Sequence, residues 1–113
     1  MATADWLTVL TTTDAEEKAA RLARGAIEAR VAACAQIAGP VTSVYRWEGG
    51  VETAREWQVL FKTTGARYEA LEAYLREEHD YETPEIIATS VVRGSAEYLR
   101  WIEGETAEEE ISG

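Results

Sequence analysis

The sequence predicts an α+β domain of ferredoxin-like topology, in which the elements run strand, helix, strand, strand, helix, strand, followed by one extra helix. Three observations predict it. Segments 6–13 and 84–92 are rich in β-branched residues, as strands are. Two stretches with helical apolar spacing follow the first strand and precede the last. Between them, residues 31–64 show two strand patterns separated by two glycines.

The chain length favours a single domain. With 113 residues and 46% hydrophobic content, the chain can build one compact core but not two independent cores. We therefore expect residues 1–113 to form one domain, with residues 104–113, "GETAEEEISG", as an acidic, solvated tail.

The first strand, "WLTVLTTT", is expected to lead directly into a helix. Thr13 or Asp14 is the predicted cap, and Glu16 and Glu17 fall in the first turn, where the helix dipole favours negative charge. The apolar side of this helix should face the sheet; it is formed by Ala15, Ala19, Leu22, Ala23, Ala26 and Ile27.

The central region predicts a long hairpin that turns at Gly49 and Gly50, because glycines accept the positive φ angles of a tight turn. Gly39 and Pro40 interrupt its first strand and predict a bulge there. Alternation places four side chains on one face of the first strand: Val41, Ser43, Tyr45 and Trp47. On the returning strand it places three side chains on one face: Trp57, Val59 and Phe61.

The remaining elements are a helix over about 66–78, a strand over 84–92 and a short capped helix that ends at Gly104. Helices of this topology cover one face of the sheet, yet both faces of the first strand are apolar, with Leu7 and Val9 opposite Trp6 and Leu10. We therefore expect another copy of the chain to cover the second face, reached by the hairpin and its tryptophans.

Charge and cysteine content limit the partners. The chain has 21 acidic and 11 basic residues, with a net charge of −10, which disfavours nucleic acid and anionic membranes and favours cations. Cys34 is the single cysteine, so no internal disulfide can form, and a reduced cytosolic thiol is the simplest interpretation. No apolar run is long enough to span a bilayer. We expect a cytoplasmic protein with no membrane or nucleic-acid partner.

The stretch "HDYETPE", residues 79–85, is the candidate site. His79 could donate an imidazole nitrogen to a metal, with Asp80, Glu82 and Glu85 as oxygen donors, a mixed set that suits copper(II) or zinc. The alternative is a structural role for His79 at a helix C-terminus or interface. The role of Cys34 also has two interpretations: it is either a soft ligand for copper or a buried, inert thiol. A single histidine is a poor metal site unless other subunits complete it.

Several linked motifs resemble the CutA family of divalent cation tolerance proteins: "ARVAACAQI", "VTSVYRWEGGVE", "LFKTT", "HDYETPEIIA" and "YLRWI". The resemblance covers about residues 6–102 and implies a ferredoxin-like fold, a tight homotrimer and a link to tolerance of copper and other divalent metals. It also places Cys34 on a cysteine seen in family members. Asp80 departs from the family, which usually has proline after this histidine. The trimer's likeness to PII signalling proteins leaves a small-ligand or regulatory role open.

Three hypotheses follow. The first is a homotrimer that binds divalent metal, with copper as the first candidate, without an organic cofactor. The second is a PII-like regulatory or scaffold module that binds a small ligand or protein. The third is an enzyme using His79 and a glutamate such as Glu85. We do not expect an enzyme, because the sequence has no glycine-rich phosphate loop and no base beside its cysteine.

Overall fold

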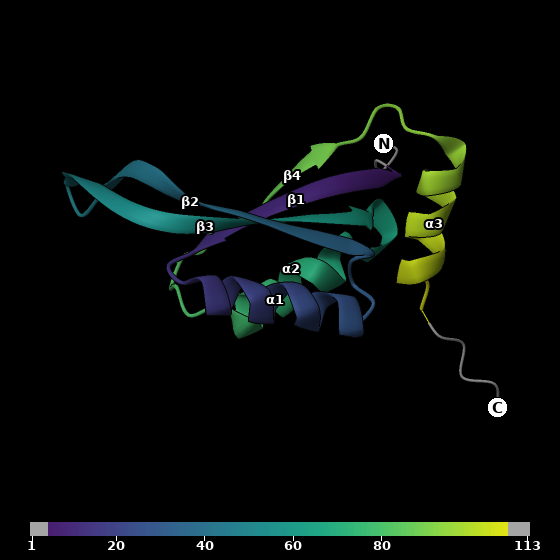
Figure 1. Cartoon of the computed structure of the whole chain (residues 1–113), viewed down its shortest axis with the longest axis horizontal. Coiled ribbons are helices and arrows are strands. Elements are labelled where there is room, and N and C mark those ends of the chain that lie inside the picture. The colour runs from purple at the N-terminus through teal and green to yellow at the C-terminus, as the bar shows by residue number, and fades with distance from the viewer. Residues whose placement is uncertain (1–4, 109–113) are drawn as a thin grey trace.

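The computed structural model describes residues 5–108 and confirms the predicted order of elements (Figure 1). These are β1 (Trp6–Thr13), α1 (Glu16–Glu28), β2 (Cys34–Trp47), β3 (Gly50–Thr64), the short 3-10 helix η1 (Gly65–Arg67), α2 (Tyr68–Glu78), β4 (Ile87–Ser90) and α3 (Ala96–Thr106).

The strands form one antiparallel sheet in the order β2-β3-β1-β4. β1 is central: it pairs with β3 from Trp6↔Thr64 to Thr13↔Trp57 and with β4 from Leu7↔Ser90 to Leu10↔Ile87. β2 and β4 are therefore the edges. Helices α1 and α2 lie side by side against one face, and α3 stands at one end of the sheet (Figure 1).

The core lies between the sheet and these two helices. Val9, Val59 and Phe61 project from the strands and are completely buried, as are Leu71 and Leu75 of α2. The predicted apolar side of α1 is confirmed for four buried residues, Ala19, Leu22, Ala23 and Ala26. It is wrong at the C-terminal end, where Ile27 is 38% exposed. Since the four buried residues are mainly alanines, α1 can approach the sheet closely.

The hairpin β2–β3 reaches well beyond the helices (Figure 1). The predicted bulge is confirmed by a register shift between Ala38 and Val41. The turn of the hairpin lies one residue earlier than expected. Its two residues are Glu48 and Gly49, with φ angles of 49° and 81°. Gly50 already pairs with Trp47. A two-residue turn between paired strands needs positive φ at both positions, so Glu48, rather than Gly50, adopts the left-handed conformation.

The cap predicted for α1 is wrong. Ala15 occupies the cap position with no side-chain hydrogen bond, while Asp14 binds Lys18 one turn on, with 2.8 Å between Oδ1 and Nζ. The hydroxyl of Thr13 has no partner among the described residues.

The C-terminal part also differs from its prediction. β4 spans four residues, far fewer than 84–92. Ser95 caps α3 as expected, accepting a hydrogen bond from the amide of Tyr98 at 3.2 Å. The helix continues past Gly104 to Thr106, because the Arg30 guanidinium donates to the carbonyls of Gly104 and Ala107. Residues 104–106 are therefore helical rather than tail, and residues 109–113 lie outside the described part.

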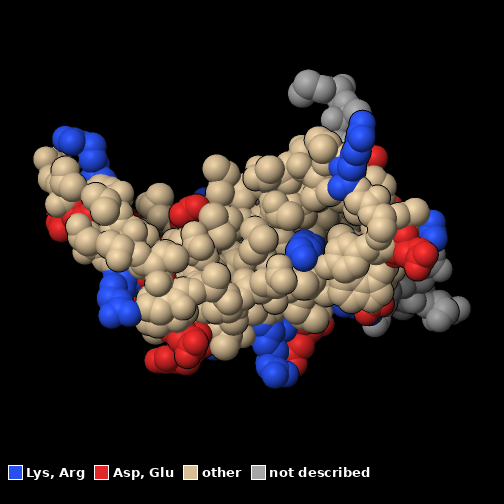
Figure 2. Space-filling view, turned by 45° about the horizontal axis from the view of Figure 1, so that its top comes forward, with Lys and Arg blue, Asp and Glu red and all other residues tan. Residues whose placement is uncertain are grey.

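The sheet face opposite α1 and α2 carries many exposed apolar side chains, as the two-sided pattern predicted. Figure 2 shows a broad uncharged surface here, with charges gathered mainly toward its margins. Large apolar residues that are exposed include Val44, Tyr45, Trp47 and Val51 on the hairpin, Ile87 on β4, Val92 in the loop after β4, and Trp101 on α3. Across residues 5–108, no helix combines the length and the apolar character that crossing a membrane requires.

Two buried threonines on β1 should respond to substitution differently from one on β3. The hydroxyls of Thr11 and Thr13 have no hydrogen-bond partner within the described chain, whereas the Thr63 hydroxyl donates to the carbonyl of Val31 at 2.8 Å. We predict that Thr11→Val raises the free energy of unfolding by about 1 kcal/mol, because it removes an unsatisfied polar group.

Thr63→Val is the matched control and should lower the free energy of unfolding by about 1 kcal/mol, because it leaves the Val31 carbonyl unpaired. Urea denaturation at one fixed protein concentration measures both. Equal destabilisation by the two variants would contradict the prediction.

Candidate functional site

His79 lies at the C-terminal end of α2, with its side chain completely buried. Its Nε2 is 2.7 Å from the carbonyl oxygen of Thr12 in β1, and its Nδ1 accepts the backbone N–H of Tyr81 at 3.0 Å. A carbonyl oxygen only accepts, so Nε2 carries the hydrogen; a backbone amide only donates, so Nδ1 is free of it. The two contacts together assign one tautomer, with the hydrogen on Nε2.

Both ring nitrogens of His79 are thus engaged by backbone groups. A metal ion, or a proton from a substrate, would have to displace one of these hydrogen bonds to reach the imidazole. The arrangement favours the structural interpretation of His79 over a ligand or general base. The ring also packs against Tyr81, with 4.6 Å between ring centroids.

Asp80 forms an ion pair on the surface. Its Oδ2 is 2.5 Å from Lys18 Nζ, which also binds Asp14 at 2.8 Å. The hydrogen bond from Lys18 lowers the pKa of Asp80, and the hydrogen bonds to Asp14 and Asp80, in that order, raise the pKa of Lys18. Lys18 therefore connects the segment before α1 to the segment after α2. Asp80 acts here as a loop anchor.

Glu82 and Glu85 instead line a groove of about 590 Å³ between the 79–85 segment and the hairpin. We call it the joint groove. Its other lining residues come from β1, β2, β3 and the same segment: Thr12, Ser43, Val44, Tyr45, Trp47, Glu56, Tyr81 and Thr83. The alternation predicted for β2 agrees with its unbroken pairing with β3 from Val41↔Glu56 to Trp47↔Gly50. The groove itself does not test it, because Val44 lines the groove and Val41 does not.

A tyrosine and a buried glutamate link the two sides of the joint groove. The Tyr81 hydroxyl donates to Oε2 of Glu56 at 2.8 Å, and Glu56 is only 8% exposed. Burial, followed by the hydrogen bond to Glu56, raises the pKa of Tyr81 above its ordinary value of 10.0. Sequence reasoning missed Tyr81; its position between the candidate ligands of "HDYETPE" was the available signal.

One chain does not bring the predicted ligands together. Within residues 5–108, no group of three or more His, Cys, Asp or Glu side chains is placed to hold a metal ion. Cys34 is half-buried, and in the sheet it lies opposite Lys62 of β3, which in turn lies opposite Thr8 of β1. His79 instead binds the carbonyl of Thr12, further along β1. Along β1 the two positions are four residues, or about 13 Å, apart, and Cys34 also lies two strands away from β1. Ligation by His79 and Cys34 at one site would need more than one copy of the chain.

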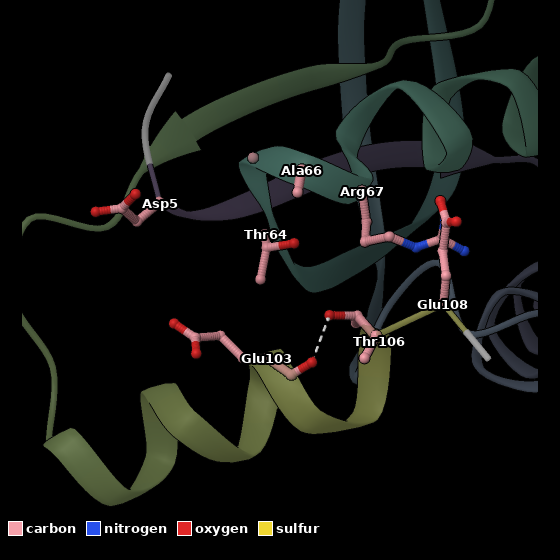
Figure 3. A pocket seen from close by; sticks show the side chains of 9 residues that line it. Asp5, Thr64, Ala66, Arg67, Glu103, Thr106 and Glu108 are labelled. Atoms are coloured by element: carbon pink, nitrogen blue, oxygen red, sulfur yellow. Dashed lines mark hydrogen bonds and ion pairs between the residues drawn. The ribbon is translucent and has the colours of Figure 1, made fainter. Parts of the chain in front are cut away.

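A second groove, of about 570 Å³, lies between α3 and the start of η1 (Figure 3). Its polar side chains largely bind the protein itself. Arg67 pairs with Glu108 at 2.9 Å and donates to the carbonyl of Arg30, and the Thr106 hydroxyl donates to the carbonyl of Ile102 at 2.8 Å. None of the predicted site residues lines this groove, so the joint groove is the better candidate.

Comparison with known proteins agrees with the sequence motifs. A family described as "CutA1 divalent ion tolerance protein" matches residues 7–105. The divalent-cation tolerance protein CutA of Thermus thermophilus is 39% identical over 98 residues, covering 87% of this chain and 95% of the relative. The protein of the same name from Pectobacterium atrosepticum is 36% identical and covers 87% and 89%.

Solved structures give the same result for the fold. CutA1 from Shewanella sp. SIB1 has a TM-score of 0.90 and 33% identity, covering 95% of this chain and all of that one. CutA from Xylella fastidiosa has a TM-score of 0.88 and 35% identity, covering 90% and 98%. A protein from Archaeoglobus fulgidus, described as a periplasmic divalent cation tolerance protein, has a TM-score of 0.86 and 32% identity, covering 89% and 98%.

Replacing Tyr81 should change how stability depends on pH. Because the folded-state pKa of Tyr81 is raised above 10.0, its contribution is complete below pH 10 and is lost as pH rises towards the folded-state pKa. We predict that Tyr81→Phe lowers the free energy of unfolding by about 1–2 kcal/mol at pH 7. This deficit should shrink by about 1 kcal/mol per pH unit above pH 10.

Urea denaturation at pH 7, 9, 10 and 11 measures this difference, with the exposed groove residue Tyr45→Phe as the control. We expect Tyr45→Phe to follow the wild type at every pH. A Tyr81→Phe deficit that stays constant from pH 7 to pH 11 would show that the Tyr81 hydroxyl is not held protonated by its surroundings.

Proposed function

The chain belongs to the CutA1 family of divalent ion tolerance proteins, and we propose that it binds divalent metal ions and contributes to divalent-cation tolerance. The observation that carries this proposal is the family match across residues 7–105. Two features of the chain support it: an excess of 21 acidic over 11 basic residues, and a groove that presents Glu82 and Glu85 to solvent. Carboxylate oxygens are ligands for divalent cations.

Copper(II) is the first candidate metal, and zinc(II) the second. Imidazole and thiolate donors favour these ions over magnesium or calcium, and His79 and Cys34 are the residues that could supply them. We propose that donors from more than one copy complete the site, with Asp80, Glu82 and Glu85 as the oxygen donors. If His79 keeps both of its backbone hydrogen bonds, the oxygen donors alone would favour harder cations instead.

We propose a homotrimer as the assembly, as the family resemblance implies. Exposed apolar residues support an assembly of copies: Val92 is 90% exposed and Val44 and Val51 are each 66% exposed. Leaving such residues in water forgoes the hydrophobic free energy that burial by another copy would provide. The edge strands β2 and β4 also offer unpaired backbone groups to a neighbour.

We place the protein in the cytoplasm. Its single free thiol, Cys34, suits a reducing compartment. One similar protein is described as periplasmic, so fractionation of cells producing this chain is the direct test. A thiol found oxidised, in a fraction outside the cytoplasm, would contradict this location.

A regulatory module that binds a small ligand is the second candidate function. The joint groove favours it, because its volume of about 590 Å³ falls within the usual range of small-molecule sites. An enzyme using His79 receives no such support, since the ring is buried and both nitrogens are hydrogen-bonded to backbone.

Calorimetric titration of metal-free protein tests metal binding. We predict saturable binding of copper(II) and zinc(II), with a defined number of ions per assembly, and much weaker binding of magnesium. A Glu82→Gln/Glu85→Gln double variant should bind copper at least about tenfold more weakly, because it removes two oxygen donors. Glu16→Gln/Glu17→Gln is the control, since it removes the same charge from exposed positions on α1.

Cys34→Ser and His79→Gln extend this titration to the nitrogen and sulfur donors. Loss of copper affinity in either variant, with the fold retained by circular dichroism, would identify that residue as a ligand. Unsaturable binding that is equal in wild type and all variants would reject a specific metal site.

The assembly has its own test. We predict that sedimentation equilibrium gives three times the chain mass of 12.5 kDa. Val92→Glu should shift the protein towards monomer, because it places a charge on an exposed apolar position that we expect the interface to bury. Ala73→Glu on the exposed side of α2 is the control. A wild-type protein that sediments as a monomer would remove the shared-site proposal.

A further inference from the structure

We propose that a second copy of the chain completes the joint groove by contributing a basic side chain that pairs with the buried carboxylate of Glu56. The candidate side chains lie at the α3 end of that copy and are Lys62, Arg93 and Arg100. The inference rests on the proposed assembly of copies. It goes further, because it names the charged groups that join one copy to the next and states that one chain holds only part of the groove.

Glu56 is a buried carboxylate that a single copy leaves without a cation. The residue is 8% exposed, and one of its carboxylate oxygens accepts the Tyr81 hydroxyl at 2.8 Å. None of the ion pairs formed within residues 5–108 includes Glu56. A buried carboxylate is normally paired with a cation, because removing its charge from water is costly. The cation is therefore expected from outside the chain.

Glu56 and Lys62 lie on the sheet face opposite α1 and α2, the face that we expect another copy to cover. Side chains alternate along β3, so both point away from Val59 and Phe61, which are buried in the core beneath the helices. Glu56 and Lys62 are six residues apart along β3, or about 20 Å. Lys62 therefore cannot reach the Glu56 of its own chain.

The α3 end of the molecule carries basic side chains that have no carboxylate partner in the described part of the chain. Lys62 donates to the Tyr98 hydroxyl of α3 at 3.4 Å. Arg93 lies in the loop between β4 and α3, and Arg100 lies on α3 itself. No ion pair within residues 5–108 includes any of the three. One copy thus has an unpaired anion in its hairpin and unpaired cations near α3.

The symmetry of a ring explains how these charges meet. The hairpin and α3 lie at opposite ends of the sheet (Figure 1). In a ring of three copies each interface joins two different patches, so the hairpin of one copy meets another part of the next copy. Arg46 and Arg55 belong to the same hairpin as Glu56 and are therefore unsuited to this role. The α3 end supplies the complementary charge.

The open edge of β2 gives a second copy access to Glu56. β2 is an edge strand, and its Val41 lies opposite Glu56 of β3. Adjacent strands are about 4.8 Å apart, so a segment docked on this edge lies about 10 Å from β3. An extended arginine or lysine side chain from such a segment can cross β2 and meet the glutamate side chain.

Sedimentation of charge variants tests the proposal, with a chelator present so that metal does not contribute. Glu56→Gln keeps the size of the side chain and an acceptor for the Tyr81 hydroxyl but removes the charge. It should weaken assembly at least about tenfold. Glu16→Gln, which removes an exposed charge on α1, should change the assembly constant by less than about twofold. Circular dichroism checks that each variant is folded.

Double-mutant cycles identify the partner. Lys62→Gln, Arg93→Gln and Arg100→Gln are each measured alone and together with Glu56→Gln. One of the three should by itself weaken assembly about as much as Glu56→Gln does, and should cost little more once Glu56 is neutral. Arg55→Gln, on the hairpin, is the control, and its effect should add to that of Glu56→Gln.

Two results would overturn this inference alone. In the first, the wild type assembles and Glu56→Gln assembles equally well. In the second, Glu56→Gln weakens assembly but couples to none of the three basic residues, or couples to Arg55 instead. A wild type that remains monomeric would overturn the inference together with the proposed assembly. Coupling to Lys62, Arg93 or Arg100 would support the inference whatever the metal titrations give, because the sedimentation is carried out without metal.

Discussion

The buried imidazole of His79 is the constraint on which the candidate site depends. By donating to the Thr12 carbonyl and accepting from the Tyr81 amide, it ties the end of α2 to the end of the central strand β1. This connection directs the next side chains to different places. Asp80 pairs with Lys18 on the surface, while Tyr81 enters the joint groove and binds Glu56. The histidine is therefore essential to the geometry of the groove without lining it.

The hairpin supplies the other half of the groove. The bulge around Gly39 and Pro40 shifts the register of β2 against β3, and a side chain at Gly39 would meet the backbone of Glu56 and Trp57 at 3.1 Å. This close approach lies beside the buried carboxylate. The same hairpin extends past the helices and exposes Val44 and Val51 (Figure 1). A single structural element thus presents both a polar groove and an apolar surface suited to another copy of the chain.

For the site, sequence reasoning identified the correct segment but did not distinguish the roles within it. "HDYETPE" contains the residues that form one wall of the groove, and Glu82 and Glu85 do line it. His79 and Asp80 were predicted as possible ligands on equal terms with them, yet one is buried against backbone groups and the other pairs with a lysine. These partners are Thr12 and Lys18, more than sixty residues away in sequence. Local spacing carries no information about such contacts.

The sequence by itself determined the order of elements, the bulge in β2 and the two-sided apolar sheet, because these follow from local periodicity, proline and glycine stereochemistry, and alternation along strands. It also determined membership of the CutA1 family, since several motifs occur in one order. Only the tertiary structure decided where α3 ends, which depends on the Arg30 guanidinium reaching the carbonyls of Gly104 and Ala107. It alone decided that Glu56 is buried without a basic partner among the described residues, because burial is a property of packing between distant elements.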